Sequence, residues 1–135
     1  MIITRIDSEL RVFAATIYAE VRNEPEEIKI WLGWIIKNRA KKNRPYWGGN
    51  SIKSVCLYPN QFECWNGVQS IDIKDLEGFH LAKRIAHQVI QDSDEQDPTE
   101  GCDHFNNPNK DVPADWMRNV KLIKRIHNHV FYREK

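Results

Sequence analysis

A short proline-centred break separates two stretches in which apolar side chains recur at helical spacing, and it leaves this chain few ways to fold. Pro25 disfavours helical geometry at Glu24 and suits a first helical position, so one helix should end near Arg22 and another should begin at Pro25. Glu26 and Glu27 then suit the positive end of the new helix dipole. Helices joined by so short a link must pack as an antiparallel or crossed pair.

Each of these two helices carries one apolar face. Asp7 or Ser8 can cap the first helix. Its apolar positions follow the i, i+3, i+4, i+7 spacing and are Leu10, Phe13, Ala14, Ile17 and Val21. The second helix should run to about Arg39, with a buried face formed by Ile28, Trp31, Leu32, Ile35 and Ile36.

The rest of the chain predicts shorter elements. Residues 40–50 are typical of a surface loop, and Ser51 can cap a short helix that runs through Leu57. A third long helix is expected over residues 75–91, with its buried face formed by Phe79, Ala82, Ile85, Ala86, Val89 and Ile90. After an acidic link, Asp103–Asn106 and Ile126–Tyr132 alternate like strands. We therefore expect a mainly α-helical fold of the α+β kind, with one small β-hairpin near the C-terminus.

Length and charge limit the possible functions. The 135 residues, 41% of them hydrophobic, predict a single domain over residues 1–135 and a monomer. A net charge of +1 implies no global attraction to polyanions. The longest apolar run is too short for membrane insertion, and no signal peptide is recognisable, so we expect cytoplasmic synthesis. Cys56, Cys64 and Cys102 should be reduced, with a Cys64–Cys102 crosslink left open.

Glu20 is the first candidate for chemistry. On a wheel of about 100° per residue with Leu10 at zero, Glu20 falls at about −80°, just beyond Phe13 at about −60°. A carboxyl group at this edge of the apolar stripe is partly desolvated, which favours the neutral form that a general acid needs. The alternative is a boundary residue paired with Arg22 or a neighbouring lysine.

A second carboxylate has several sources. Glu24 stands one helical turn after Glu20 and could work with it, as the carboxyl pairs of glycosidases do, or could cap the next helix. Asp97, Glu100 and Asp103 could also supply a carboxylate, although a run of acids between elements is usually a solvated surface.

The histidines allow two interpretations. His127 and His129 would point the same way on a strand, which suggests metal ligands, with His104 as a further candidate. Nothing in the spacing completes a ligand set, so we expect no metal and no cofactor. Hydrogen bonds within the hairpin, or contacts to a polar substrate, are the other roles.

The stretch between Ile28 and Phe62 is strongly basic. It has no acidic residue and seven basic ones, namely Lys29, Lys37, Arg39, Lys41, Lys42, Arg44 and Lys53. With Tyr46, Trp47 and Trp65 nearby, such a stretch could bind a sugar polymer or a nucleic acid, although a solvated loop explains it equally well. Nucleic-acid binding would weaken steeply with salt.

Five phrases together resemble the cell wall hydrolases of the spore-cortex-lytic (SleB/CwlJ) type. They occur in the family's order and are Ala15–Glu24, Trp34–Arg39, Gln61–Asn66, Asp97–Phe105 and His127–Tyr132. The resemblance spans residues 15 to 132, and five phrases in register make a chance match improbable.

The resemblance implies a lysozyme-like domain that cuts peptidoglycan glycan strands between N-acetylmuramic acid and N-acetylglucosamine. It places the catalytic glutamate of a lytic transglycosylase at Glu20, where one carboxyl group acts as acid and then as base. Glu24 then has a supporting role. The expected substrate-binding residues are Glu24, Gln61, Phe62 and Trp65 on one side of a groove and His104, Asn106, His129 and Tyr132 on the other.

Some features depart from the family pattern. Val21, Asn23, Cys102 and Asp103 replace small residues, which we expect to reshape the groove and alter substrate preference. A bare catalytic domain suggests a bacteriolytic phage endolysin or a secreted effector that reaches the cell wall after release or delivery. The alternatives are a hydrolytic muramidase, a catalytically silent glycan-binding module and a nucleic-acid binder.

Overall fold

The computed structural model describes all of residues 1–135. Its four α-helices are α1 (Glu9–Glu20), α2 (Glu26–Lys42), α3 (Ile52–Leu57) and α4 (Leu76–Gln91). Its five strands are β1 (Ile2–Thr4), β2 (Ser70–Asp72), β3 (His104–Asn106), β4 (Val120–Ile126) and β5 (His129–Glu134). Short 3-10 helices cover Pro45–Trp47, Glu63–Trp65, Asp94–Gln96 and Asp115–Asn119. None of the α-helices combines the length and apolar character that a membrane crossing requires.

The break between α1 and α2 lies where the proline predicts it. The first helix ends at Glu20, and Pro25 is the extended residue that immediately precedes α2, at φ −57° and ψ 155°. The buried side chain of Lys29 holds this connection, because its Nζ donates to the backbone oxygen of Arg22 at 3.3 Å and to that of Glu24. The connection is therefore tied to the first turn of α2.

Side-chain caps are present at the other helix starts, and the sequence predicts those at Ser8 and Ser51. Ser8, Ser51 and Asp75 each accept a hydrogen bond from the backbone three residues ahead. The second helix runs past its predicted end to Lys42, and Asn43, at φ 52°, ends it in the left-handed conformation. The region predicted as a surface loop is thus partly helical.

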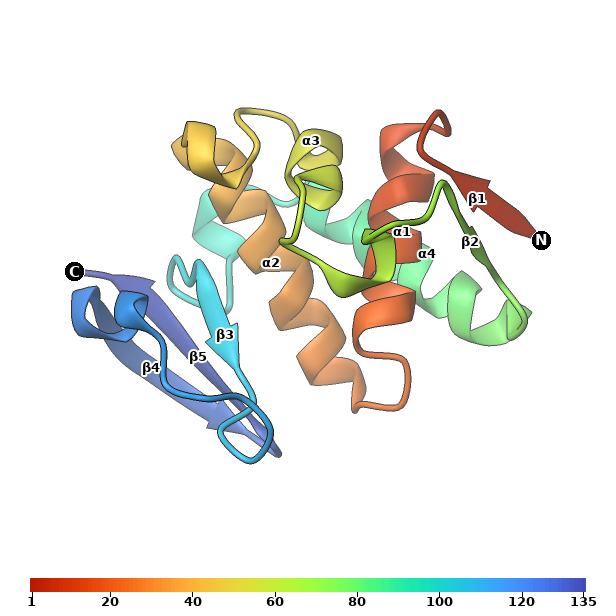
Figure 1. Ribbon diagram of the computed structural model, residues 1–135. Helices are drawn as coiled ribbons and strands as arrows, with labels where there is room; N and C mark the ends of the chain where they lie inside the picture. Colours follow the sequence, from red (N-terminus) through yellow and green to blue (C-terminus); the bar gives the residue numbers. More distant parts are fainter.

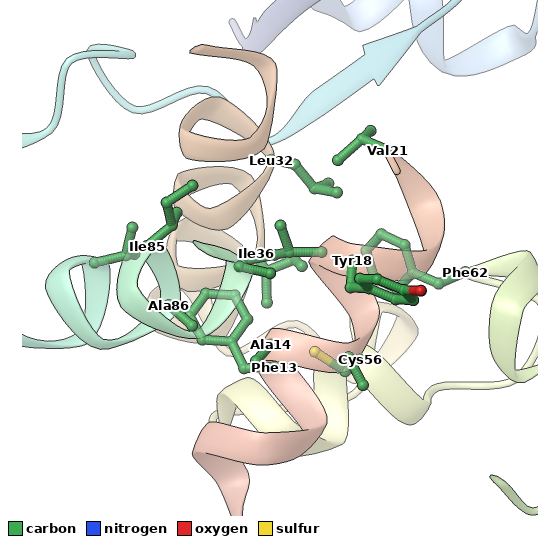
Figure 2. Packing of buried hydrophobic residues seen from close by; sticks show 14 of the residues in the cluster. Phe13, Ala14, Tyr18, Val21, Leu32, Ile36, Cys56, Phe62, Ile85 and Ala86 are labelled. Carbon is green, nitrogen blue, oxygen red and sulfur yellow. The ribbon is translucent and has the colours of Figure 1, made fainter. Parts of the chain in front are cut away.

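The core lies where α1, α2 and α4 meet. Figure 2 shows Phe13, Leu32, Ile36 and Ala86 directed into a common apolar space from these three helices. Gly33 permits the close approach of α2 to α4, because a Cβ there would lie 3.2 Å from Val89 Cγ2. The predicted apolar faces are buried except at Leu10, which is partly buried, and at Ile90, which is 36% exposed.

The mainly helical α+β class is confirmed, and a hairpin of β4 and β5 lies near the C-terminus, but the structure contains two small sheets where a single hairpin was expected. In the first, β1 pairs antiparallel with β2, and Ile3 lies opposite Ile71. Each of these strands has only three residues, too few for an alternating pattern to be recognised. The second sheet has the order β3-β5-β4.

The predicted strand Ile126–Tyr132 is interrupted by a turn. His127, at φ 54°, separates the end of β4 from the start of β5. Strand β4 escaped prediction because only Val120 and Ile126, at its two ends, are buried. The interpretation of His127 and His129 as neighbours on one strand face is therefore also wrong.

Figure 1 shows the two sheets at opposite ends of the molecule, with the helices between them. The three-stranded sheet packs on α2, where the rings of Trp31 and Phe131 meet edge to face with centroids 5.1 Å apart. The chain thus forms a helical body with a β-sheet against one side, and the candidate site lies between these two parts.

Candidate active site

A groove of about 770 Å³ runs between the C-terminal end of α1 and the three-stranded sheet. Six of the nine predicted site residues line it, namely Glu20, Glu24, Gln61, Phe62, His104 and His129. The predicted residues thus lie on both sides of one groove, although they are up to about a hundred residues apart in the chain.

The other three predicted residues lie behind the groove wall. Trp65 is 2% exposed, and its Nε1 donates to Thr16 Oγ1 at 2.9 Å in the core. The buried Tyr132 donates from its hydroxyl to Asn106 Oδ1 at 3.0 Å. These side chains support the wall and are absent from the groove lining, because their polar atoms are used within the fold.

Glu20 is the last residue of α1, and its half-buried carboxyl group has no cationic partner. Its Oε2 accepts a hydrogen bond from the backbone N–H of Cys64 at 3.0 Å. Burial raises the pKa of Glu20, and the negative charge of Glu63 raises it further, whereas the hydrogen bonds from Cys64 act in the opposite direction. The guanidinium of Arg22 lies over the Tyr18 ring at 5.1 Å. The alternative of an ion-paired boundary residue is therefore wrong.

Glu24 lies in the same groove but in a different setting. Its Oε2 is 3.8 Å from Nδ1 of His127, and its side chain is 24% exposed. No side chain caps α2, so Glu24 does not have the capping role that its position suggested. The carboxylate is available to the groove beside the hairpin turn.

The acidic link supplies no second carboxylate to the groove. Asp97 organises its own loop, accepting from Thr99 N at 2.7 Å and Gly101 N at 3.0 Å, and it also accepts from Asn38 Nδ2 at 3.0 Å. Asp103 is fully buried, and neither it nor Glu100 lines the groove. Asp97 and Asp103 are thus structural residues and not part of a solvated acidic surface.

Asp103 holds His104 in place at the groove. Its Oδ1 is 2.7 Å from Nδ1 of His104, and its other oxygen pairs with Nζ of Lys42. Burial alone would raise the pKa of Asp103, but the hydrogen bonds from His104 and Lys42 outweigh it and hold the pKa below its ordinary value. The His104 ring is therefore oriented by a charged carboxylate.

Trp116 is a groove residue that the sequence did not reveal. Its ring lies 4.7 Å from that of His104, and Trp47 meets His104 from another direction at 5.5 Å. These three rings form an aromatic surface in the groove wall. Trp116 lies in a connection without periodicity, and only the fold of the sheet brings it to His104, so no sequence signal could have found it.

The histidines do not assemble a metal centre. His127 projects from the turn with 61% of its side chain exposed, whereas His129 is buried in the groove wall. The structure has no group of three His, Cys, Asp or Glu side chains suited to a metal ion. Burial lowers the pKa of His129. The three cysteines are free.

Three cations of the basic stretch form ion pairs with acidic residues from distant parts of the chain, and the other four donate hydrogen bonds to backbone oxygens. Lys41 pairs with Asp94 at 2.7 Å, and Arg44 pairs with Glu134 at 3.1 Å. The remaining cations bond to Asp103 or to backbone oxygens, and they are Lys29, Lys37, Arg39, Lys42 and Lys53. The polyanion surface that the local composition suggested is thus largely occupied by internal contacts.

The sequence model of the Cell Wall Hydrolase family matches residues 23–132, and the chain belongs to this family. The family resemblance seen in the five phrases is thereby confirmed. The matched residues begin just after Glu20 and do not include it. The evidence that Glu20 is a functional residue is therefore its position in the groove.

Two relatives extend the comparison. The spore cortex-lytic enzyme of Bacillus subtilis (strain 168) is 26% identical over 126 residues, which cover 93% of this chain and 37% of the relative. That of Halalkalibacterium halodurans is 25% identical over 126 residues, covering 93% of this chain and 34% of the relative. The chain thus spans little more than a third of these proteins.

Two solved structures share the fold. One is the catalytic domain of the germination-specific lytic transglycosylase SleB from Bacillus anthracis, with a TM-score of 0.68 and 20% identity over 97% of this chain and all of that one. The other is the catalytic domain of the Bacillus cereus SleB protein, with a TM-score of 0.68 and 21% identity over 93% of this chain and 89% of that one.

Proposed function

We propose that this chain cleaves peptidoglycan glycan strands between N-acetylmuramic acid and N-acetylglucosamine as a lytic transglycosylase, with Glu20 as its acid and base. The observation that carries the proposal is a half-buried carboxyl group without a counter-ion on the wall of an open groove. Membership of the Cell Wall Hydrolase family and the names of the relatives support the substrate class.

The environment of Glu20 suits both halves of such a reaction. Burial favours the protonated carboxyl group, which would donate its proton to the glycosidic oxygen as the bond to C1 breaks. The carboxylate left behind would be stabilised by the N–H of Cys64. It would then take the proton from the muramic 6-hydroxyl as that oxygen attacks C1. This step closes a 1,6-anhydro ring and returns the proton to Glu20.

The groove walls offer contacts for sugars on both sides of the cleaved bond. The half-buried ring of Trp116 would stack on a sugar face, and the buried rings of His104 and Trp47 pack beside it and support it. Gln61 is held by two hydrogen bonds from its Nε2, to the backbone oxygens of Trp47 at 2.9 Å and Val55 at 2.8 Å. Its amide oxygen has no such partner and would accept a hydrogen bond from a sugar hydroxyl.

Mass spectrometry of fragments released from purified peptidoglycan tests the proposal. The expected products carry anhydromuramic ends. Reducing muramic ends would show that water is the acceptor, which would make the chain a hydrolytic muramidase. Release of no fragment by a folded protein would contradict the enzyme and favour a glycan-binding module.

The proposal includes the number of domains in the chain and its oligomeric state. We infer that residues 1–135 act as one catalytic domain, because one core cluster joins all four α-helices to Phe131 of β5. Action as a monomer stays a prediction. Action as an endolysin or as a delivered effector stays a prediction. Lysis of intact cells with the protein added from outside, compared with lysis after expression inside, would test it.

A further inference from the structure

The two histidines of the groove differ in which ring nitrogen has a partner inside the protein. Nδ1 of His104 lies 2.7 Å from Oδ1 of Asp103, whose carboxylate can only accept a hydrogen bond. Nδ1 of His104 therefore carries a proton. In the neutral ring, Nε2 then has a lone pair, and it has no partner in the protein. The groove face of His104 is thus a hydrogen-bond acceptor.

His129 has the opposite arrangement. Its Nδ1 is buried and has no hydrogen-bond partner, while the residue as a whole is 8% exposed and lines the groove. A proton on Nδ1 would be a buried donor without an acceptor, which proteins rarely tolerate. The neutral ring therefore carries its proton on Nε2. That atom has no partner in the protein and is not among the buried unpaired atoms, so it keeps access to the groove.

We infer that His129 is a specificity-determining residue, whose Nε2–H donates a hydrogen bond to the carbonyl oxygen of an acetamido group on the glycan strand. His104 accepts a hydrogen bond from a sugar hydroxyl in the same groove. An N-acetylhexosamine polymer offers both an amide carbonyl and hydroxyl groups, whereas its N-deacetylated form keeps the hydroxyls but has lost the carbonyl. The inference rests on the proposed function for the class of substrate.

The packing around His129 provides variants that keep the fold. Its ring lies 6.0 Å from that of Phe105 and 6.4 Å from that of Phe131. His129→Phe keeps an aromatic ring there and removes the donor, while His129→Gln restores an N–H near the position of Nε2. His87→Gln is the control, because His87 is an exposed histidine on α4 that does not line the groove.

The test measures binding of peptide-free glycan strands, N-acetylated and chemically N-deacetylated, by titration calorimetry on a Glu20→Gln background that prevents cleavage. The readout is the ratio of the two affinities in each variant. Because Glu24 and Asp111 are present in every variant, their attraction to the free amines cancels when ratios are compared.

The preference for N-acetylated strands should fall about tenfold in His129→Phe and should be kept in His129→Gln and His87→Gln. An unchanged ratio in His129→Phe, or no binding of either strand, would overturn the inference. Cleavage is scored separately with Glu20 intact. If fragments are released but the affinity ratio does not depend on His129, only this inference is overturned. If the affinity ratio depends on His129 but no fragments are released, the inference is supported and the proposed function is overturned.

Discussion

Glu20 combines burial with the absence of a positive partner, and this combination sets the pH range in which its carboxyl group can donate a proton. Because the pKa is raised, the acid form persists to higher pH than in a free glutamate. Activity that needs this form is lost as the pH rises through the pKa of Glu20.

Removing the negative charge of Glu63 should lower that pKa, since Glu63 is one of the groups that raise it. In Glu63→Gln the alkaline limb of the pH–rate profile should therefore move to lower pH, with the protein otherwise folded. Glu77→Gln, an exposed change on α4 outside the groove, is the control and should leave the limb in place. A shift to higher pH in Glu63→Gln would contradict this account of the site.

Single residues differed in how well the sequence predicted them. Glu20 could be placed at the edge of the core because helical geometry converts its sequence position into an angle. Trp65 was misplaced because an aromatic side chain in a loop can face the core or the groove equally well. Asp103 can be buried because it pairs with Lys42 of α2 and with the adjacent His104. Lys42 lies far from Asp103 in the sequence, so no local pattern predicts this pair.

Among the elements, the three-stranded sheet is held to α2 by Asp103 in addition to the contact between Trp31 and Phe131. Asp103 precedes β3, pairs with Lys42 of α2 and accepts from the backbone N–H of Glu134 in β5 at 3.1 Å. Removing its charge takes one of two carboxylate partners from Lys42 and leaves one amide oxygen where two charged oxygens served Lys42, His104 and the Glu134 N–H. Asp103→Asn should lower the free energy of unfolding by about 3 kcal/mol near neutral pH.

The same residue predicts how stability depends on pH. A carboxyl group whose pKa is lowered by folding stabilises the protein above its unfolded pKa, and this stabilisation is lost as the pH falls through the folded pKa. The difference between wild type and Asp103→Asn should therefore narrow on acidification, as followed by thermal unfolding. Asp94→Asn, on the surface, is the control and should change little. A stability difference between wild type and Asp103→Asn that stays constant or grows as the pH falls would contradict a charged Asp103.

The connection between α1 and α2 depends on Lys29 in a similar way. Lys29→Met removes the donor to the carbonyls of Arg22 and Glu24, so the segment that follows Glu20 should loosen. Activity should fall in addition to a loss of about 1 to 3 kcal/mol of stability. Lys37→Met is a matched change in α2, where Nζ donates to Val89 O at 2.8 Å, away from the groove. Lys37→Met should reduce stability but leave kcat unchanged. Equal losses of kcat in Lys29→Met and Lys37→Met would contradict a specific role of Lys29 in the segment that follows Glu20.

Helices were predictable from the sequence, whereas most of the sheet structure was not. Apolar periodicity and capping residues are local, and they located all four α-helices to within a few residues. Strands β1 and β2 are too short to show a period, and β4 carries charges on residues that face solvent. The turn at His127 lacks the glycine that usually marks such a hairpin.

At the scale of the whole molecule, acidic residues from the C-terminal part of the chain pair with the cations at the end of α2 and just after it. Asp94, Asp103 and Glu134 neutralise cations that the local sequence leaves unpaired. The local composition predicted a basic surface because these partners lie dozens of residues away.

Binding to a labelled DNA duplex should accordingly be weak. We expect a Kd above about 10⁻⁶ M at about 150 mM salt, measured by fluorescence anisotropy. The weak binding that remains at low salt should not depend on Glu20. Tight binding that survives this salt concentration would contradict the internal pairing of the basic stretch.

The rate of glycan-strand cleavage by Glu20→Gln, relative to wild type and to Glu24→Gln, tests whether Glu20 is the catalytic acid and base. Glutamine keeps the size of the side chain but cannot donate or take up the proton, so the rate should fall at least about 100-fold while thermal unfolding stays unchanged. Glu24→Gln, in the same groove, should keep most of the rate and the same anhydromuramic ends. Near wild-type cleavage by a folded Glu20→Gln variant would contradict the assignment of the acid and base to Glu20.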